Sequence, residues 1–375
     1  MNRAAELKIA LVHDYLAQEG GAERVLHIFQ ELFPQAPTYT LFYDQAKMGG
    51  LYRGKDIRTS YLQKAPGIFK HYQWYLALMP SATESYDLSQ YDFVLSSASA
   101  FAKGVITQQD AYHLCYCHTP TRYLWSDTHS YVKELHYPAV IKKILPPLLS
   151  RLRVWDLSAA NRVDGFIANS NYIANRISKY YQRQSKVIYP PVDVEKFKVS
   201  NEVGNYYLAG GRLVAYKRFD LVVQAFNQLK MPLKIFGAGP ELEHLKKIAN
   251  RNIQFVGRVG DEKLVDLYSH AVAYIHPQVE DFGITAIESM ASGRPVVAYK
   301  VGGAAETVIE NKTGIFFDDQ SWEALADTIV RFNDNSFNSA DIRRHAEAFS
   351  ISTFKANIKS TIEEIMNKPE HERRY

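Results

Sequence analysis

The pattern of apolar positions predicts two successive series of buried strands, each strand followed by a loop and a helix. The first series opens with Leu7–Val12, a continuous apolar run interrupted only by Lys8, which is typical of a parallel strand buried on both faces. Similar runs predict strands at 92–97, 111–117 and 165–169, with helical stretches between them. This alternation predicts an α/β fold with a parallel sheet covered by helices on both faces.

A proline-rich and polar segment at 189–205 marks a domain boundary, and a fresh alternation begins after it. Five strand–loop–helix units follow, with strands expected at 206–209, 233–236, 253–256, 273–276 and 295–299. They predict a second doubly wound domain. The predicted division is a first Rossmann-like domain at 1–190, a linker at 191–205, a second Rossmann-like domain at 206–350 and a closing helical segment at 351–375.

Composition agrees with two soluble cores and excludes several classes of protein. The 375 residues are 46% hydrophobic and 22% charged, which is ordinary for globular domains. A formal net charge of +4 is too small to indicate a nucleic-acid partner without a clustered basic patch. We expect no signal peptide, because the apolar opening run is a short strand followed by polar residues, and no membrane-spanning helix, because no apolar run is long enough to cross a bilayer. We therefore expect a cytoplasmic protein.

The two cysteines, Cys115 and Cys117, lie two positions apart in a predicted strand and so share a face. That spacing stretches disulfide geometry, and so few cysteines favour a reducing compartment. A metal site built on Cys117 and His118 lacks a second ligand cluster in the sequence. No metal is expected there.

Two features of the first half indicate a ligand site. Gly20-Gly21 separates the first strand from a helix predicted at 22–33, and such glycines let a ligand lie against bare backbone, although a tight turn alone explains them equally well. His118 follows the strand at 111–117. The carboxyl end of a parallel strand is where open α/β sheets bind ligands, so His118 is either a site residue or a structural histidine.

In the second half, the stretch from Glu280 to Gly293 combines two carboxylates with a helix start. The apolar spacing predicts a short helix beginning near Ile284, with Glu280 on the loop before it and Glu288 inside it. Gly293 occupies the position where a helix end favours a left-handed residue. Amides at the helix start offer an anion site. The same pattern also fits a solvated helix with an acid near its first turn.

The glycines at Gly237 and Gly239 only begin a dinucleotide-binding fingerprint. Leu242 stands where the third glycine is expected, so the signal for a nicotinamide cofactor is weak.

Two basic amphipathic stretches fit either an anionic membrane surface or core helices with solvated outer faces. The first places six apolar residues on one predicted helical face: Ile68, Phe69, Tyr72, Tyr75, Leu76 and Met79. The second spans 141–153 and carries Lys142, Lys143, Arg151 and Arg153. Pro146-Pro147 is expected to break or restart this second helix.

Four motifs together carry a family resemblance. They are Gly20-Gly21-Ala22-Glu23-Arg24, His118-Thr119-Pro120, Gly211-Arg212 with Lys217, and Glu280-x7-Glu288. In order and spacing they resemble family 4 retaining glycosyltransferases of the GT-B fold, over nearly the whole chain. The run from Cys117 to Trp125 looks like bacterial mannosyltransferases of cell-surface polysaccharide and lipopolysaccharide assembly. The resemblance implies two Rossmann-like domains facing each other across a cleft, with the closing helix packed on the first domain.

The resemblance also implies roles for individual residues. Glu280 and His118 would be the catalytic pair that contacts the transferred sugar. The donor diphosphate would contact Arg212, Lys217, Gly20 and Gly21, and the donor sugar and phosphates would contact the backbone of Phe282, Gly283 and Ile284. Glu288 would bind the ribose, and Gly257, Arg258 and Val259 would border the base. Tyr15, Arg122 and Trp125 are the residues expected at the acceptor.

The implied reaction is retaining transfer of an α-mannosyl group from GDP-mannose to a saccharide or lipid-linked saccharide, without a cofactor or metal. No Asp-x-Asp occurs in the sequence, which agrees with a metal-independent transferase. A peripheral site on the inner face of the cell membrane is a further expectation. The alternatives are a transferase with a UDP-linked donor, a sugar-nucleotide epimerase of the same fold, a nicotinamide oxidoreductase and a non-catalytic sugar-binding module.

Overall fold

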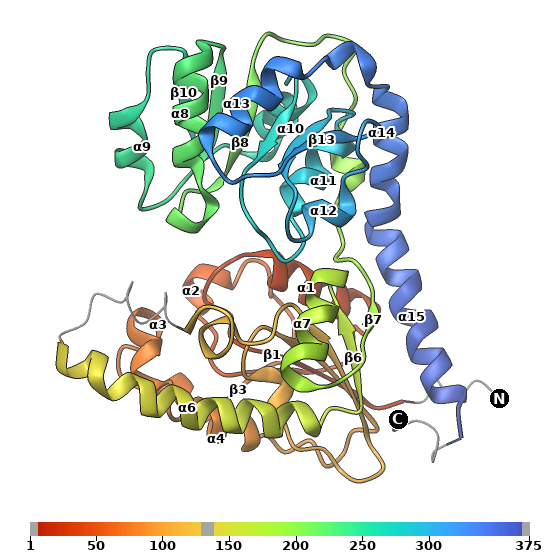
Figure 1. The fold of residues 1–375 in the computed structure, drawn as a ribbon. Coiled ribbons are helices and arrows are strands. Elements are labelled where there is room, and N and C mark those ends of the chain that lie inside the picture. The colour runs from red at the N-terminus through yellow and green to blue at the C-terminus, as the bar shows by residue number, and fades with distance from the viewer. Residues whose placement is uncertain (1–6, 129–138, 370–375) are drawn as a thin grey trace. The chain divides into compact units, whose positions relative to one another are not determined.

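The computed structural model describes residues 7–128 and 139–369, with side chains of the helix at Ala139–Asn161 described from residue 145 onward. The chain divides into two units, Met1–Pro190 with Lys355–Tyr375, and Pro191–Phe354. Each unit is a parallel sheet flanked by helices (Figure 1). The segment expected to be a linker, 191–205, falls in the second unit, where Val192 forms a β-bridge with Ser350.

The first unit contains a seven-stranded parallel sheet in the order β3-β2-β1-β4-β5-β6-β7. Its strands are β1 Ile9–His13, β2 Thr38–Thr40, β3 Ile57–Thr59, β4 Phe93–Ala98, β5 Tyr112–Cys117, β6 Gly165–Ala168 and β7 Lys186–Val187. Its helices are α1 Gly21–Leu32, α2 Gln45–Met48, α3 Ile68–His71, α4 Met79–Glu84, α6 Ala139–Asn161 and α7 Asn171–Tyr181. The strand order reverses between β1 and β4, so the ends of these two strands form the switch point of this sheet.

Strand alternation divides the core of this unit between the two faces of the sheet. Cys115 and Cys117 face one core with Ile173 of α7, as their shared strand face predicts, and both thiols are free and buried. Tyr116, which alternates to the opposite face, packs edge-on against Phe29 of α1, with ring centroids 5.9 Å apart. Helices therefore cover both faces, which explains why the strands are apolar throughout.

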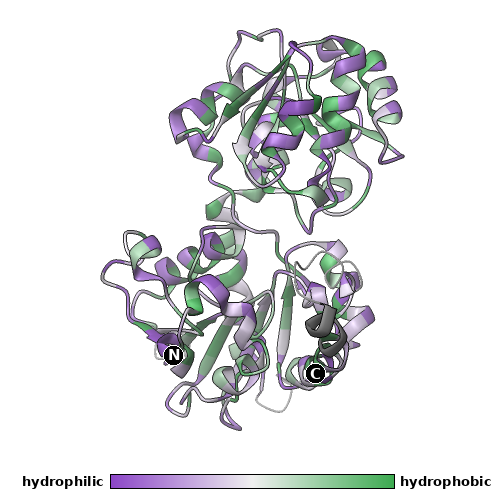
Figure 2. Cartoon of the chain, turned by 90° about the vertical axis from the view of Figure 1, so that its left-hand side faces the viewer, coloured by the Kyte–Doolittle hydropathy of each residue, from purple (hydrophilic) through white to green (hydrophobic). Residues whose placement is uncertain are grey.

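The second unit contains a six-stranded parallel sheet in the order β10-β9-β8-β11-β12-β13. Its strands are β8 Tyr207–Arg212, β9 Leu233–Ala238, β10 Ile253–Gly257, β11 Tyr274–His276, β12 Val296–Tyr299 and β13 Gly314–Phe317. Its helices are α8 Phe219–Leu229, α9 Leu242–Ile248, α10 Asp261–Ser269, α11 Ile284–Ala291, α12 Ala304–Thr307, α13 Trp322–Arg331 and α14 Ser339–Ala346. Here the order reverses between β8 and β11. In both units the central strands are apolar, as Figure 2 shows by their green colour.

The last helix, α15 Ile351–Asn367, begins in the second unit and continues in the first. Within the first unit it is fixed by charged pairs: Lys355 Nζ lies 2.7 Å from Glu31 Oε2 of α1, and Lys186 Nζ lies 2.8 Å from Glu364 Oε2. Its buried apolar residues are Phe354, Ile358, Ile362 and Met366.

The first amphipathic stretch is not one helix, contrary to the prediction. It is divided into α3, a 3-10 turn at Tyr72–Tyr75, and α4, which has a proline in its first turn. A proline in the first turn of a helix favours a new helix start there, because its missing N–H would have no partner within the helix in any case. Ile68, Leu76 and Met79 are buried in one core cluster, so these apolar residues pack inside the protein.

The second amphipathic stretch belongs to α6, which continues through Pro146 and Pro147 where a break was expected. Both prolines are exposed, so water can satisfy the backbone carbonyls that lose an N–H donor there. The side chains of Lys142 and Lys143 lie outside the described residues. No helix in the described ranges is both long and apolar enough to cross a bilayer.

Candidate donor and sugar site

The switch point of the second sheet brings two predicted site residues into direct contact. Lys217 ends the 3-10 turn Ala215–Lys217 that follows β8, and Glu280 lies on the loop between β11 and α11. Because β8 and β11 are neighbouring parallel strands, their following loops meet at one edge of the sheet. Lys217 Nζ lies 2.7 Å from Glu280 Oε1.

This ion pair is mostly shielded from water. The side chains of Lys217 and Glu280 are 11% and 18% exposed. Burial alone would lower the pKa of Lys217, but the charge and hydrogen bond of Glu280 outweigh it and raise the pKa above its ordinary value. Lys217 is therefore a fixed cation at neutral pH. A side-chain carbon added at Gly211 would lie 3.5 Å from Lys217 Nζ, so the cation lies close over the backbone at the end of β8.

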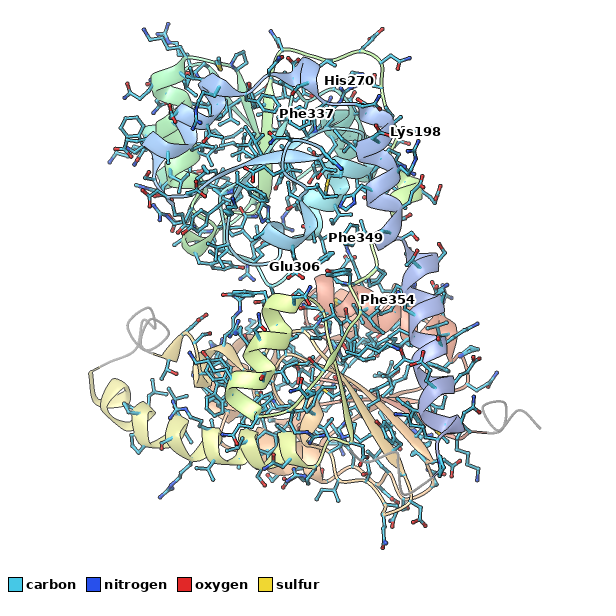
Figure 3. All side chains as sticks on the ribbon, turned by 45° about the vertical axis from the view of Figure 1, so that its right-hand side comes forward. Lys198, His270, Glu306, Phe337, Phe349 and Phe354 are labelled. Atoms are coloured by element: carbon cyan, nitrogen blue, oxygen red, sulfur yellow. The ribbon has the colours of Figure 1, made fainter. Side chains whose placement is uncertain are left out.

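The loop that carries Glu280 is held by close backbone contact with Gly302 and Gly303. The Gly303 amide donates to the Glu280 carbonyl at 2.9 Å. A side-chain carbon at Gly302 would lie 2.5 Å from that carbonyl oxygen, and one at Gly303 would lie 2.3 Å from the Phe282 backbone. Only glycine fits at both positions. The ring of Phe282 packs against that of Phe349, which is labelled in Figure 3, with ring centroids 5.7 Å apart.

Gly283, the N-cap residue of α11, has a left-handed conformation with a φ of 93°, which favours glycine. The helix starts at Ile284 as predicted, and Gly293 after its end has a φ of 71°. The amides of a first helical turn point out of the helix and can bind an anion. The predicted phosphate-binding backbone of Phe282, Gly283 and Ile284 therefore lies on the same loop as Glu280.

His276 is a site neighbour that sequence reasoning missed. It ends β11, is fully buried, and its Nδ1 lies 3.2 Å from Gln278 Nε2. Burial first, and then Lys217, lower the pKa of His276 to about 4, although Glu280 acts in the opposite direction. A side-chain carbon at Gly283 would lie 3.2 Å from the His276 ring. The neutral imidazole of His276 thus lies against Gly283 and supports the loop that carries Glu280. Its signal in the sequence was its position at the end of a buried strand.

Glu288 is placed in α11 as predicted. It is 6% exposed, and Tyr268 Oη donates to its Oε2 at 3.2 Å. Arg212 is exposed at the end of β8, while Gly257 ends β10 and precedes Arg258 and Val259. Since β9 separates β10 from β8, the predicted base-bordering residues follow a strand that is not adjacent to β8.

The incomplete fingerprint Gly237-x-Gly239 has a packing explanation. A side-chain carbon at Gly237 would lie 1.8 Å from the Gly211 carbonyl oxygen, and one at Gly239 would lie 2.0 Å from that of Leu213. These glycines allow the ends of β8 and β9 to approach each other.

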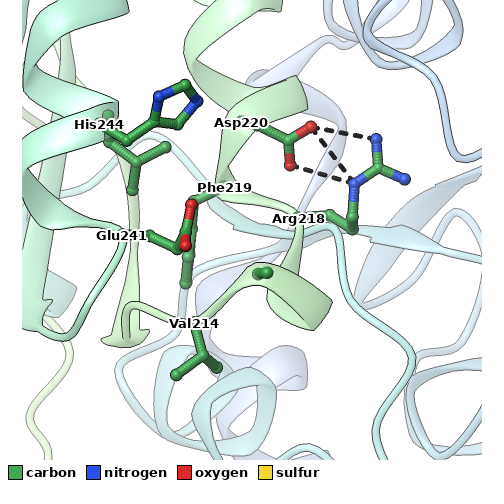
Figure 4. Close-up of a pocket in the computed structure, with 8 residues that line it drawn as sticks. Val214, Arg218, Phe219, Asp220, Glu241 and His244 are labelled. Carbon is green, nitrogen blue, oxygen red and sulfur yellow. Dashed lines mark hydrogen bonds and ion pairs between the residues drawn. The ribbon is translucent and has the colours of Figure 1, made fainter. Parts of the chain in front are cut away.

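A separate cavity of about 460 Å³ opens on this unit (Figure 4). It is lined by Val214, Ala215, Arg218, Phe219, Asp220, Glu241, His244 and Leu245. Arg218 Nε lies 3.0 Å from Asp220 Oδ1, so the charges on this wall largely compensate each other. Neither Lys217 nor Glu280 lines this cavity.

In the first unit, His118 directly follows β5 and is 9% exposed. Its Nε2 lies 2.8 Å from Ser97 Oγ, and its carbonyl accepts a hydrogen bond from Asn169 Nδ2 at 2.9 Å. Burial, with a further effect of His13, lowers the pKa of His118 to about 3. His118 is therefore a neutral, fixed imidazole. Gly20 precedes α1 and Gly21 begins it, so the helix starts one residue earlier than predicted.

The three residues expected at the acceptor all lie in the first unit, where they have different contacts. Trp125 donates its indole N–H to Asp156 Oδ2 at 2.8 Å and stacks on Tyr180, with centroids 5.1 Å apart. Tyr15 stacks on Phe42 at 5.0 Å, and burial raises its pKa. Arg122 begins the 3-10 turn Arg122–Leu124. The indole of Trp125 thus supports the loop after His118.

Asp14 is a further residue that sequence reasoning did not single out. Its carboxylate accepts four backbone amides at 2.7–2.9 Å, from Ser99, Ala100, Phe101 and Ala102. This fixes the loop after β4 beside the switch point of the first sheet. No cluster of three or more potential metal ligands occurs among the residues that the structure describes.

The two parallel sheets, each with site residues at its switch point, define a protein of two Rossmann-like units. Comparison with known proteins gives its family. A model described as Glycosyltransferase Family 4 matches residues 20–196, and one described as Glycosyl transferases group 1 matches residues 193–349. The chain belongs to the family 4 glycosyltransferases and has the GT-B fold.

Individual relatives agree with this family. A GDP-mannose-dependent alpha-(1-6)-phosphatidylinositol monomannoside mannosyltransferase of Mycobacterium tuberculosis is 30% identical over 193 residues, which cover 43% of this chain and 50% of that protein. The D-rhamnosyltransferase WbpZ of Pseudomonas aeruginosa is 25% identical, over 58% of this chain and 61% of that protein. The matches thus span about half to three-fifths of the length of these relatives.

Among solved structures, Anabaena Alr3699/HepE in complex with UDP matches with a TM-score of 0.70 and 18% identity. The match covers 96% of this chain and 100% of that one. At this identity the likeness supports the fold.

Proposed function

We propose that this chain is a retaining, metal-independent glycosyltransferase that moves an α-mannosyl group from GDP-mannose to a saccharide or lipid-linked saccharide acceptor in surface polysaccharide biosynthesis. The observation that carries the proposal is the buried Lys217–Glu280 pair at the switch point of the second sheet, beside the start of α11. This arrangement offers a fixed cation, a carboxylate and helix amides at one edge, which suits a nucleotide sugar.

The chemistry follows from where charge develops. Departure of a nucleoside diphosphate builds negative charge on the leaving group and positive charge on the sugar. In the proposal, Lys217 and Arg212 stabilise the diphosphate, and Gly20 and Gly21 contact it through bare backbone. Glu280 stabilises the oxocarbenium-like sugar, and His118 contacts the same sugar. Interactions that strengthen as charge separates raise turnover more than donor affinity.

Donor identity rests on likeness and is directly testable. The mycobacterial relative named for GDP-mannose supports a guanosine donor, whereas the structural neighbour in complex with UDP makes a UDP-linked sugar the second candidate. Thermal unfolding of the full chain with GDP, GDP-mannose, UDP and UDP-glucose separates them, because a ligand of the folded state raises the melting temperature. Stabilisation by the uridine pair alone would reject GDP-mannose.

The reaction type requires product analysis. With GDP-mannose and an alkyl α-mannoside as a stand-in acceptor, we expect a new glycoside and released GDP. Its anomeric proton signal should keep the donor's α configuration, and activity should survive EDTA. A β product would reject retention, an epimerised nucleotide sugar would indicate an epimerase, and full EDTA inhibition reversed by a divalent ion would reject metal independence.

Peripheral contact with an anionic membrane is part of the proposal for a lipid-linked acceptor. Arg151 of α6 is exposed, whereas Arg153 donates to the Leu124 carbonyl at 2.6 Å and lies 5.8 Å from the Trp125 ring centroid. Neutralising Arg151 together with Lys142 and Lys143 should therefore weaken salt-sensitive sedimentation with phosphatidylserine vesicles without disturbing the core. Unchanged sedimentation would favour a purely structural helix.

A further inference from the structure

Four polar side chains form a continuous row at the switch point of the first sheet. His13 ends β1, Ser97 lies in β4, His118 follows β5, and Glu23 lies in the first turn of α1. The row follows from the strand register: His13 pairs with Ser97 across β1 and β4, and the His118 amide donates to Ala98 at 2.9 Å.

The row runs from a carboxylate to the site histidine. Glu23 Oε1 lies 3.6 Å from His13 Nε2, His13 Nδ1 lies 3.2 Å from Ser97 Oγ, and Ser97 Oγ lies 2.8 Å from His118 Nε2. All four residues are at least nine-tenths buried. Ser97 is thus within hydrogen-bond distance of both histidine rings, and Glu23 adds a carboxylate at ion-pair distance. The buried serine–histidine contacts have few ways to place their protons, because each unpaired donor or acceptor would carry a desolvation cost.

We infer that Glu23, His13 and Ser97 act as positioning residues that hold His118 in one orientation and one tautomer. The inference rests on the proposed function, because the remaining ring nitrogen of His118 is assigned to a hydroxyl of the bound sugar.

The hydroxyl of Ser97 couples the two rings, because it lies within hydrogen-bond distance of both. A hydroxyl has one proton, so it can donate to only one of the two facing ring nitrogens and accepts from the other. The proton positions of His13 and His118 are therefore linked, and the row selects one tautomer of His118.

Because His118 Nε2 is engaged by Ser97, Nδ1 is the ring nitrogen left for a sugar hydroxyl. The tautomer decides whether Nδ1 donates or accepts in that contact, so the row sets both its orientation and its polarity.

The tautomer can be read directly in the full chain labelled with 15N-histidine. Long-range proton–nitrogen correlation spectra should show His118 in one tautomer, its signals being assigned by their loss in His118→Gln. A mixture of both His118 tautomers in the wild-type chain would overturn the inference, whether or not transfer activity has been found.

Variants then test the row. Ser97→Ala and Glu23→Ala should each give mixed tautomers of His118, and with a confirmed donor they should lower kcat about tenfold or more while KM for the donor changes little. Ser97→Thr retains the hydroxyl and should restore one tautomer and most of kcat. Wild-type turnover together with a single unchanged tautomer in both alanine variants would overturn the inference.

The chain provides a matched control on the neighbouring residue. Ser96 Oγ lies 2.8 Å from His113 Nε2, and both residues are fully buried in the same sheet. Ser96→Ala removes a comparable serine–histidine hydrogen bond outside the row. It should leave the His118 tautomer and kcat unchanged. A loss in Ser96→Ala equal to that in Ser97→Ala would reduce the effect to general loss of stability and overturn the positioning role.

Discussion

Lys217 Nζ lies 2.7 Å from Glu280 Oε1, so the proposed diphosphate cation and the proposed sugar carboxylate are direct partners. This contact means that neither residue acts alone. A substitution at one changes the charge and position of the other, because the pair is largely removed from water. Their effects on catalysis should therefore be coupled.

Lys217→Met should lower turnover about a hundredfold or more, the scale for loss of one group that stabilises charge in a transition state. The double variant Lys217→Met/Glu280→Gln should be little worse than the poorer single variant, because the two residues act as a unit. Steady-state kinetics on the four proteins of this cycle measure the coupling.

The control for this cycle is Lys246→Met. Lys246 forms an ion pair with Glu243 at 3.0 Å, but both side chains are largely exposed. Removing it should leave turnover near the wild-type value. Independent, multiplicative losses at Lys217 and Glu280 would contradict the paired role.

Glu280 and Glu288 should fail differently when each is replaced by glutamine. Glu280→Gln should lower kcat far more than donor affinity, since its charge matters most as the sugar becomes positive. Glu288→Gln should mainly weaken donor affinity, because ribose contacts are similar in ground and transition states. Donor titration by calorimetry with separate measurement of kcat distinguishes the two. If both variants lost only affinity, Glu280 would be a binding residue and His118 the next catalytic candidate.

A buried ionic network in the first unit supports a stability prediction. Asp156 accepts hydrogen bonds from Lys103, Thr121, Trp125 and Tyr181 at 2.6–2.8 Å and is 1% exposed. Burial alone would lower the pKa of Lys103, but Asp156 outweighs it and raises the pKa. Asp156→Asn should therefore cost about 3–5 kcal/mol, because it leaves a buried cation without its anion.

Tryptophan fluorescence during urea unfolding can measure this loss in the first unit, since Trp125 contacts Asp156 directly. Adding Lys103→Met to Asp156→Asn should recover much of it by removing the buried charge. The exposed pair Lys300–Glu310 provides the comparison, and Glu310→Gln should cost less than about 1 kcal/mol. Equal losses of unfolding free energy in Asp156→Asn and Glu310→Gln would show that burial does not determine the cost of removing an ion-pair partner.

Much of the fold could be predicted from the sequence because its central strands carry a strong signal. Strands such as β1, β5 and β8 are continuous apolar runs bounded by turn residues, and their positions agree with the prediction to within a few residues. The strands β2, β3 and β7 were not predicted. They have only two or three residues, too few to show a period. The four-residue β13 was also missed, although β6 and β12 have the same length and were predicted.

The sequence predicted which residues of the candidate site follow strands, but it did not predict which residues they contact. The positions of Glu280, Lys217 and His118 after strands could be read locally. Their partners depend on strand order, which brings together loops far apart in sequence. The Gly302–Gly303 support of the Glu280 loop and the Ser97 contact to His118 are of this kind. Only the folded sheets show them.

The buried histidines give the last prediction, on acid stability. Burial first, with Arg162 as a second cause, lowers the pKa of His113 to about 3, and the values for His118 and His276 are about 3 and about 4. In the unfolded chain a histidine titrates near pH 6.5. The unfolded state therefore binds more protons as the pH falls below about 6.5, so acid removes the stability that these neutral histidines retain above that pH.

Each such histidine should contribute a slope of about 1.4 kcal/mol per pH unit to the free energy of unfolding between about pH 4.5 and 6. His113→Gln removes one of them on β5, outside the proposed donor and sugar contacts, and should flatten the slope by about that amount. Ser96→Ala serves as the control: it removes the Ser96–His113 hydrogen bond but keeps the titrating ring, and so should lower stability at every pH without flattening the slope. Urea unfolding in a pH series measures both variants. An unchanged slope in His113→Gln would mean that this histidine is already protonated in the folded protein.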